Sequence, residues 1–241
     1  MLVQEQALSK LANAMRIYGE AHMNFNHLKQ IDAEEAIDNL DRAMEAKLEA
    51  FHSLYDVTKD QFDYFNHADT AILILLRNAI HHRNHLLFRT WNQEMGLNDG
   101  HKKYLGGEFL LASHDVSTNG HKMNHLYKLE DFYLRVDSSL SSEFIEDRMS
   151  SKNREKLLSQ FENDLSFGAL KEYAKGERYP LKQVYINIIP IYISATVKVF
   201  KALKDNGLNF IGFDANAYKE AFTNELEVDL NSFNYSTIRI L

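Results

Sequence analysis

The sequence predicts a mainly α-helical protein, an up-and-down helical bundle followed by a C-terminal extension, and two observations support this fold class. Apolar residues recur at three- and four-residue steps in residues 4–28, and the same period returns in residues 37–55 and 71–91. The composition allows a large core, because 45% of the 241 residues are hydrophobic. We expect the bundle in residues 1–95. Residues 96–241 should form a mixed, mainly helical extension that packs on the bundle and has room for a few short strands.

The first two helices of the bundle are predicted most clearly. In residues 4–28 one side of the helix is expected to carry Leu8, Leu11, Met15, Tyr18, His22 and Phe25. Asp32 followed by Glu35 has the spacing of a capping box, which predicts that the second helix begins there. The apolar stripe of this second helix is expected to be Ile37, Leu40, Met44, Leu48, Phe51 and Tyr55.

Residues 71–91, with the sequence AILILLRNAIHHRNHLLFRTW, are expected to form a third helix with two incompatible faces. At about 100° per residue, the polar side chains fall within an arc of roughly 140°, and we call them the cationic stripe: Arg77, Asn78, His81, His82, His85 and Arg89. The opposite face is apolar apart from Arg83, and it needs a core. Crowded cations repel one another and lose hydration when buried, so the cationic stripe is the candidate functional site.

The amino-acid composition changes where the extension begins. Residues 96–120 hold five of the ten glycines, and a short strand or hairpin is expected around residues 107–113. The apolar residues in 126–140 show no regular spacing, so the sequence does not decide between a helix and a strand there. A helix is expected again in residues 152–167, with Gly168 ending or bending it.

Pro180 is expected to begin a further helix that runs to Asn206-Gly207 and kinks at Pro190. The β-branched content of this segment would also suit strands, but its length and its Asn-Gly stop favour a helix. Asp214 is expected to cap a short helix, and residues 232–241 should be extended.

Composition excludes several classes of protein. The chain has no cysteine, which removes disulfides and thiolate chemistry and fits a reducing compartment. The N-terminus lacks the pattern of a signal peptide, and the longest apolar run, residues 184–200, contains Asn187, Pro190 and Lys198, so we expect a cytoplasmic protein without a membrane partner. A formal net charge of −7 argues against a protein that coats nucleic acid, although it does not exclude a local basic cleft.

Residues 77–82, RNAIHH, carry a family resemblance. Arg77 is followed after four residues by His82, and the polar Asn78 comes directly after the arginine. This pattern resembles the signature of the HEPN superfamily, over roughly residues 1–95. The resemblance implies a helical bundle whose motif lies on one helix, a homodimer in which two motifs meet in one cleft, and, as in many members, a metal-independent ribonuclease. A toxin or an antiviral-defence effector, with an antitoxin protein as a further partner, follows by the same analogy.

The chemistry fits these residue types. Cutting RNA without a metal or other cofactor needs groups that take and give a proton and positive charge on the transition state. A histidine titrates in the useful range, and an arginine can bind two phosphate oxygens. We therefore expect Arg77, Asn78 and His82 to be catalytic, with RNA contacts from His81, His85 and Arg89. One arginine and one histidine in each protomer make a sparse site. A two-fold axis would bring two of each into one cleft, which is a chemical reason to expect a homodimer.

Two other functions use the same residues. Residues 79–83 also resemble the end of the helix motif of DinB-like bundles, in which three histidines bind a metal. His81 and His85 have suitable spacing, and His52 or His22 could be the third ligand, but Asn78 stands where a histidine of that motif is expected. Alternatively, the stripe is a binding surface for RNA or protein without catalysis. The hypothesis that we carry forward is the endoribonuclease.

Overall fold

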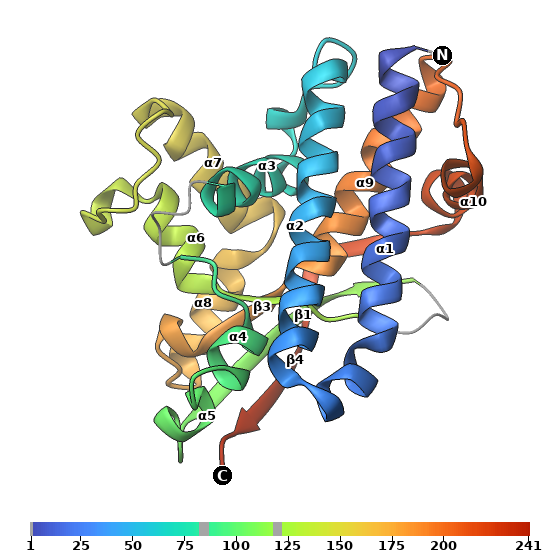
Figure 1. The fold of residues 1–241 in the computed structure, drawn as a ribbon. Coiled ribbons are helices and arrows are strands. Elements are labelled where there is room, and N and C mark those ends of the chain that lie inside the picture. The colour runs from blue at the N-terminus through green and yellow to red at the C-terminus, as the bar shows by residue number, and fades with distance from the viewer. Residues whose placement is uncertain (1, 82–86, 118–121) are drawn as a thin grey trace. The chain divides into compact units, whose positions relative to one another are not determined.

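A computed structural model describes residues 2–81, 87–117 and 122–241 (Figure 1). This part of the chain contains ten α-helices and a four-stranded sheet, which confirms a mainly α-helical fold with a few short strands. Contacts divide the chain into two compact units. Unit 1 includes residues 2–78, 117 and 192–227, and unit 2 includes residues 79–81, 87–116, 122–191 and 228–241. Each unit joins segments from both sides of residue 95, and the expected division into a bundle in residues 1–95 and an extension in residues 96–241 stays a prediction.

The first two helices of unit 1 agree with the sequence. α1 (Val3–Ile31) and α2 (Ala33–Thr58) run side by side in opposite directions (Figure 1). Asp32 separates them, and its side chain accepts the backbone N–H of Glu35 at 3.0 Å, as the capping spacing predicts. The predicted stripe of α2 is buried, except that Tyr55 is half-buried.

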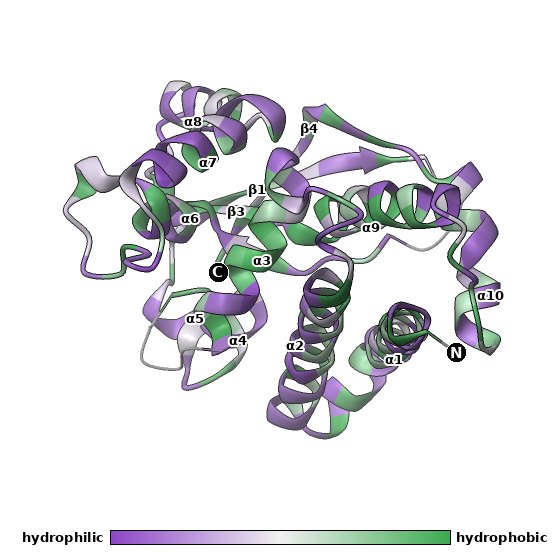
Figure 2. Cartoon of the chain, turned by 90° about the horizontal axis from the view of Figure 1, so that it is seen from above, coloured by the Kyte–Doolittle hydropathy of each residue, from purple (hydrophilic) through white to green (hydrophobic). Residues whose placement is uncertain are grey.

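A third and a fourth helix complete the bundle of unit 1. α3 (Ala68–His81) follows a short 3₁₀ turn (Tyr64–Asn66), and residues 68–76, which include the apolar run 71–76, are all buried (Figure 2). The fourth helix is α9 (Ile188–Asp205), whose part from Tyr192 onward belongs to unit 1. The buried carboxylate of Asp69 on α3 accepts hydrogen bonds from Ser194 at 2.6 Å and Lys198 at 2.7 Å on α9.

The short helix α10 (Phe213–Glu220) packs on α1, and a π-helical turn (Ala221–Glu225) follows it. Asp214 does not cap α10, contrary to expectation. The N-cap is Gly212, at a φ of 95°, where a side chain would also approach the Ser9 hydroxyl. The carboxylate of Asp214 instead binds Arg16 and Asn13 of α1, each at 3.0 Å, which fastens the two helices together.

Unit 2 is built on a sheet with the strand order β2-β3-β1-β4. Its strands are β1 (Glu108–Val116), β2 (Leu126–Lys128), β3 (Val184–Asn187) and β4 (Val228–Arg239). β1 and β3 are parallel, and the outer strands pair antiparallel to them. β1 and β4 confirm the extended segments expected around residues 107–113 and 232–241.

Five helices and two 3₁₀ turns (Ser138–Leu140 and Leu181–Gln183) accompany this sheet. Trp91 of α4 (Trp91–Gly96) packs edge-on against Phe109 of β1 and Tyr185 of β3, at 5.2 and 4.9 Å between ring centroids. The other helices are α5 (Gly100–Lys103), α6 (Leu129–Val136), α7 (Ser151–Asp164) and α8 (Phe167–Gly176). Phenylalanines of α6, α7 and α8 contact one another in a buried cluster.

The prediction of one helix over residues 71–91 is wrong. The described part of α3 ends at His81, and residues 82–86 lie outside the described residues. Phe88 has a φ of 60°, which no α-helix contains, and its backbone N–H donates to the buried Asp131 at 2.8 Å. Thr90 then starts α4 with a capping box that includes Gln93. Arg89 is therefore not on the helix face that carries Arg77.

Two helix limits in the extension also differ from expectation. The helix expected from Pro180 starts only at Ile188, because residues 184–187 form the buried central strand β3. Pro190 therefore lies in the first turn of α9, where its missing N–H costs no helical hydrogen bond and no kink is required. The helix in residues 152–167 ends before Ser166, at a φ of 56°, and Gly168 lies inside the next helix, α8.

Candidate functional site

The guanidinium of Arg77 is the best-defined part of the candidate site. Arg77 lies near the end of α3 with a side chain that is 19% exposed. Its Nη2 donates to Oε2 of Glu49 on α2 at 2.8 Å, and its Nη1 donates to Oδ1 of Asn78 at 3.2 Å. The Nε–H is buried and has no hydrogen-bond partner among the described residues. Arg77 and Asn78, which are neighbours in the sequence, share one of these hydrogen bonds, and the Nε–H of Arg77 stays unsatisfied among the described residues.

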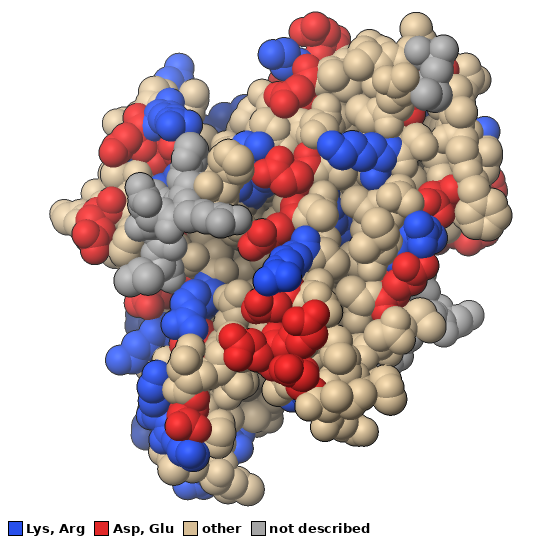
Figure 3. Space-filling view, in the orientation of Figure 1, with Lys and Arg blue, Asp and Glu red and all other residues tan. Residues whose placement is uncertain are grey.

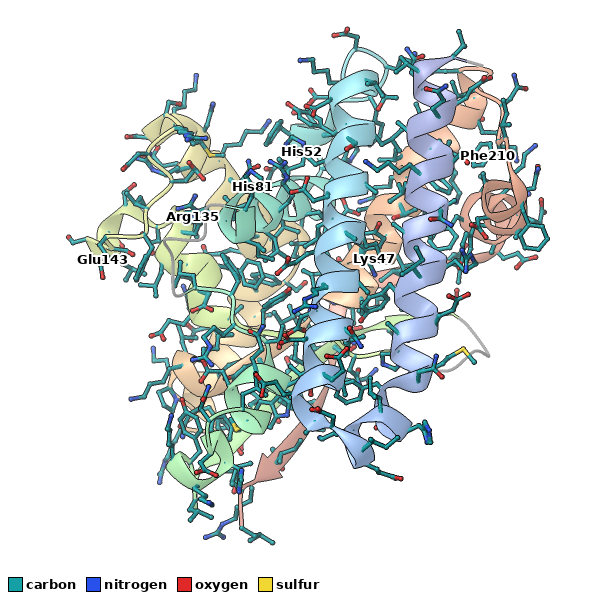
Figure 4. All side chains as sticks on the ribbon, viewed as in Figure 1. Lys47, His52, His81, Arg135, Glu143 and Phe210 are labelled. Carbon is teal, nitrogen blue, oxygen red and sulfur yellow. The ribbon has the colours of Figure 1, made fainter. Side chains whose placement is uncertain are left out.

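An imidazole on α2 accompanies this arginine. His52 lies one turn after Glu49, on the side of α2 that faces α3 (Figure 4). Burial and, to a smaller extent, the charge of Arg77 lower the pKa of His52, so a neutral ring is favoured at neutral pH. Its Nδ1 lies 3.2 Å from Oδ2 of Asp56. A neutral ring that donates Nδ1–H to Asp56 keeps Nε2 as an acceptor, which is the form that a general base needs.

Sequence reasoning missed the association of Glu49 and His52 with Arg77. The Glu-x-x-His step on the second helix is visible in the sequence, but nothing local links it to residue 77. The link arises because α2 and α3 pack in the same bundle, and the contact joins residues 28 positions apart. The resulting group is Glu49, His52, Asp56, Arg77 and Asn78, which we call the Arg77 cluster.

The remaining residues of the cationic stripe do not form one described surface. His82 and His85 lie outside the described residues. His81 is the last residue of α3 and is exposed. Arg89 belongs to unit 2, where its Nε lies 3.6 Å from Glu94 of α4, and Glu94 also binds Lys128. The predicted roles of His81, His82, His85 and Arg89 stay predictions.

The histidines do not assemble a metal site in the described part of the chain. Among these residues, no three histidine, aspartate or glutamate side chains group in a way that could hold an ion. His114 is buried on β1, where its Nδ1 lies 2.8 Å from the carbonyl of Ser232 and its ring stacks on Phe233. The DinB-like alternative depends on His85, outside the described residues, and stays an unproved alternative.

The electrostatic surroundings of the Arg77 cluster are acidic. Acidic residues exceed basic ones within unit 1, whereas the two balance within unit 2, so unit 1 carries the net charge of the chain. Acidic side chains gather over α2 on the face shown in Figure 3. A phosphate at Arg77 would have to displace Glu49, which is 40% exposed.

The resemblances to known families depend on the residues alone. Comparison of the chain with protein-family models, with curated proteins and with solved structures gives no significant match. In addition, no helix of the described residues is long and apolar enough to cross a membrane.

Proposed function

We propose that the chain is a metal-independent endoribonuclease of HEPN type, in which Arg77, Asn78 and His82 act in a composite cleft of a homodimer. The observation that carries the proposal is the buried Nε–H of Arg77, a charged donor without a partner among the described residues, next to Asn78. The guanidinium of an arginine on a polar helix end can bind two phosphate oxygens of RNA once Glu49 is displaced from it. A role as a toxin or antiviral-defence effector, held by an antitoxin protein, belongs to the same proposal.

The residues of the Arg77 cluster can be given separate catalytic roles in this proposal. The Asp56–His52 pair supplies an imidazole with an acceptor nitrogen, which can take the proton of the RNA 2′-hydroxyl. As the attacking oxygen bonds to phosphorus, negative charge builds on the phosphate oxygens, and Arg77 stabilises it. His82 then gives a proton to the 5′-oxygen that leaves. Glu49 positions Arg77 until the phosphate replaces it.

The test is RNA cutting by purified protein in excess EDTA. Single-stranded RNA should be cut to products with cyclic phosphate ends, and DNA of the same sequence should survive because it lacks the internal nucleophile. Arg77→Ala and His82→Ala should abolish cutting, and His52→Gln should slow it and remove the loss of activity on acidification. Arg42→Ala is the matched control, because Arg42 is an ion-paired arginine elsewhere on α2.

The outcomes separate the proposal from its alternatives. RNA that stays intact after removal of any co-purifying antitoxin overturns the nuclease. Full activity of His82→Ala would instead overturn the assignment of the site to the Arg77–His82 motif. A DinB-like site would instead lose a bound metal to EDTA, with metal affinity that depends on His81 and His85.

A non-catalytic binding module is the second candidate, and the ion pair of Arg77 with Glu49 in an acidic unit favours it. Such a module would bind RNA or a protein without cutting. Arg77→Ala would then weaken binding and leave the RNA intact.

A further inference from the structure

The connection between α2 and α3 presents an exposed phenylalanine on a capped turn. Phe65 lies in the 3₁₀ turn Tyr64–Asn66 and is 38% exposed. The carboxylate of Asp63 caps this turn, because it accepts the backbone N–H of Phe65 at 3.2 Å and a hydrogen bond from the amide of Asn66. The cap therefore fixes the backbone from which Phe65 projects.

The residue before Phe65 anchors the turn in the core of unit 1. Tyr64 is only 1% exposed, and its hydroxyl lies 2.7 Å from that of Thr58 on α2. Its ring packs edge-on against Phe51 and Phe62, at 5.9 and 4.9 Å between ring centroids. Tyr64 therefore holds the turn in place, while Phe65 beside it keeps part of its surface in solvent.

Two ring contacts lead from Phe65 to the Arg77 cluster. The ring of Phe65 lies edge-on to that of Tyr55 on α2, at 5.9 Å between centroids. Tyr55 is half-buried, and its ring lies 5.3 Å from that of His52. All three residues belong to unit 1. An aromatic surface that reaches solvent therefore adjoins the imidazole that we propose as the general base.

The charges around this aromatic surface indicate which part of an RNA it can bind. Residues 56–65 contain three aspartates and one lysine, so this segment repels a phosphate group. A nucleobase is uncharged, and every base has a π face that can stack on an aromatic side chain. The surface therefore fits a base and not the sugar-phosphate backbone.

The structure of a nucleotide places a base at this position. The carbon that bears the base is bonded to the carbon that bears the 2′-hydroxyl. When that hydroxyl gives its proton to His52, the base of the same nucleotide must lie close by. The ring that packs on His52 is that of Tyr55, and Phe65 extends the aromatic surface outward from Tyr55.

We propose that Tyr55 and Phe65 form the subsite for the base on the 5′ side of the cut, and that this subsite prefers a purine. A purine offers a larger face for stacking than a pyrimidine does. The inference rests on the proposed nuclease, and it adds a substrate preference that the motif of α3 does not supply.

The first test is the cutting of chimeric oligonucleotides by the full-length chain in EDTA. Each oligonucleotide contains one ribonucleotide in a DNA strand, so only one 2′-hydroxyl can attack. Adenosine at this position should give a higher kcat/KM than uridine. Phe65→Leu should lower kcat/KM for adenosine by about tenfold and remove most of the preference, whereas Phe65→Tyr should keep it. Phe213→Leu is the matched control, because Phe213 is an exposed phenylalanine elsewhere in unit 1.

The second test does not depend on cutting. In the same oligonucleotide the ribonucleotide is replaced by 2′-O-methyl-2-aminopurine riboside, which cannot be cut and whose fluorescence falls when the base stacks. Wild type and Phe213→Leu should quench this fluorescence, and Phe65→Leu should quench it much less. Unchanged circular dichroism shows that each variant is folded.

The two tests separate this inference from the proposed nuclease. Quenching that depends on Phe65 without any cutting supports the base subsite and overturns the nuclease. Cutting without a base preference, with equal quenching by wild type and Phe65→Leu, overturns the subsite and leaves the nuclease in place. Absence of both cutting and quenching overturns both.

Discussion

At the scale of single residues, the most unusual ionisable group is a lysine inside the bundle of unit 1. Lys47 on α2 is only 4% exposed and forms no ion pair among the described residues (Figure 4). Its Nζ lies 3.8 Å from the ring centre of Tyr18 and 4.0 Å from that of Tyr192. Burial lowers the pKa of Lys47 to about 7, while the two rings partly compensate the lost hydration.

This lysine gives a prediction about pH. In the unfolded chain Lys47 titrates near 10.5, so between about pH 7 and 10.5 the unfolded state binds more protons than the folded state. The contribution of Lys47 to the free energy of unfolding therefore rises with pH through that window, by up to about 1.4 kcal/mol per pH unit. Denaturant unfolding should measure this effect. The free energy of unfolding of wild type minus that of Lys47→Met should rise above pH 7, and the same difference for the exposed Lys10→Met, the control, should not. A constant difference would show that Lys47 stays charged in the fold.

At the scale of elements, periodicity predicts α1 and α2 because each has one clear buried stripe. The same argument fails for β3. Its residues 184–186 are apolar and all four of its residues are buried in an inner strand, so the sequence pattern there cannot be told from that of a buried helix. It also fails after His81, because the turn at Phe88 depends on a hydrogen bond to Asp131, 43 residues away. The motif singles out Arg77 and Asn78 as candidates in the sequence, and that assignment stays a prediction, whereas Glu49 and His52 join them only through the packing of α2 against α3.

The burial of α3 predicts different costs for two similar substitutions. Leu76 is fully buried, so Leu76→Asp places an unpaired charge in the core and should unfold unit 1. Ile80 is half-buried one turn later, so Ile80→Asp should lower the melting temperature less. Circular dichroism melts compare the two, and His82→Ala serves as a variant that should stay folded. Equal melting of Leu76→Asp and wild type would contradict the packing of α3, and early melting of His82→Ala would make that histidine a core residue.

At the scale of the whole molecule, the proposed nuclease needs a contact between two copies. One cleft must hold two copies of the Arg77 cluster and His82, and that motif begins in unit 1. A contact of this kind is isologous, so the same surface of each copy forms it around a two-fold axis.

Light scattering tests this contact. The purified chain should be a dimer in solution, because one arginine and one histidine make a sparse site and a two-fold axis would bring two of each into one cleft. RNA cutting in EDTA should be a property of that dimer. A stable monomer that cuts RNA would contradict the two-protomer mechanism.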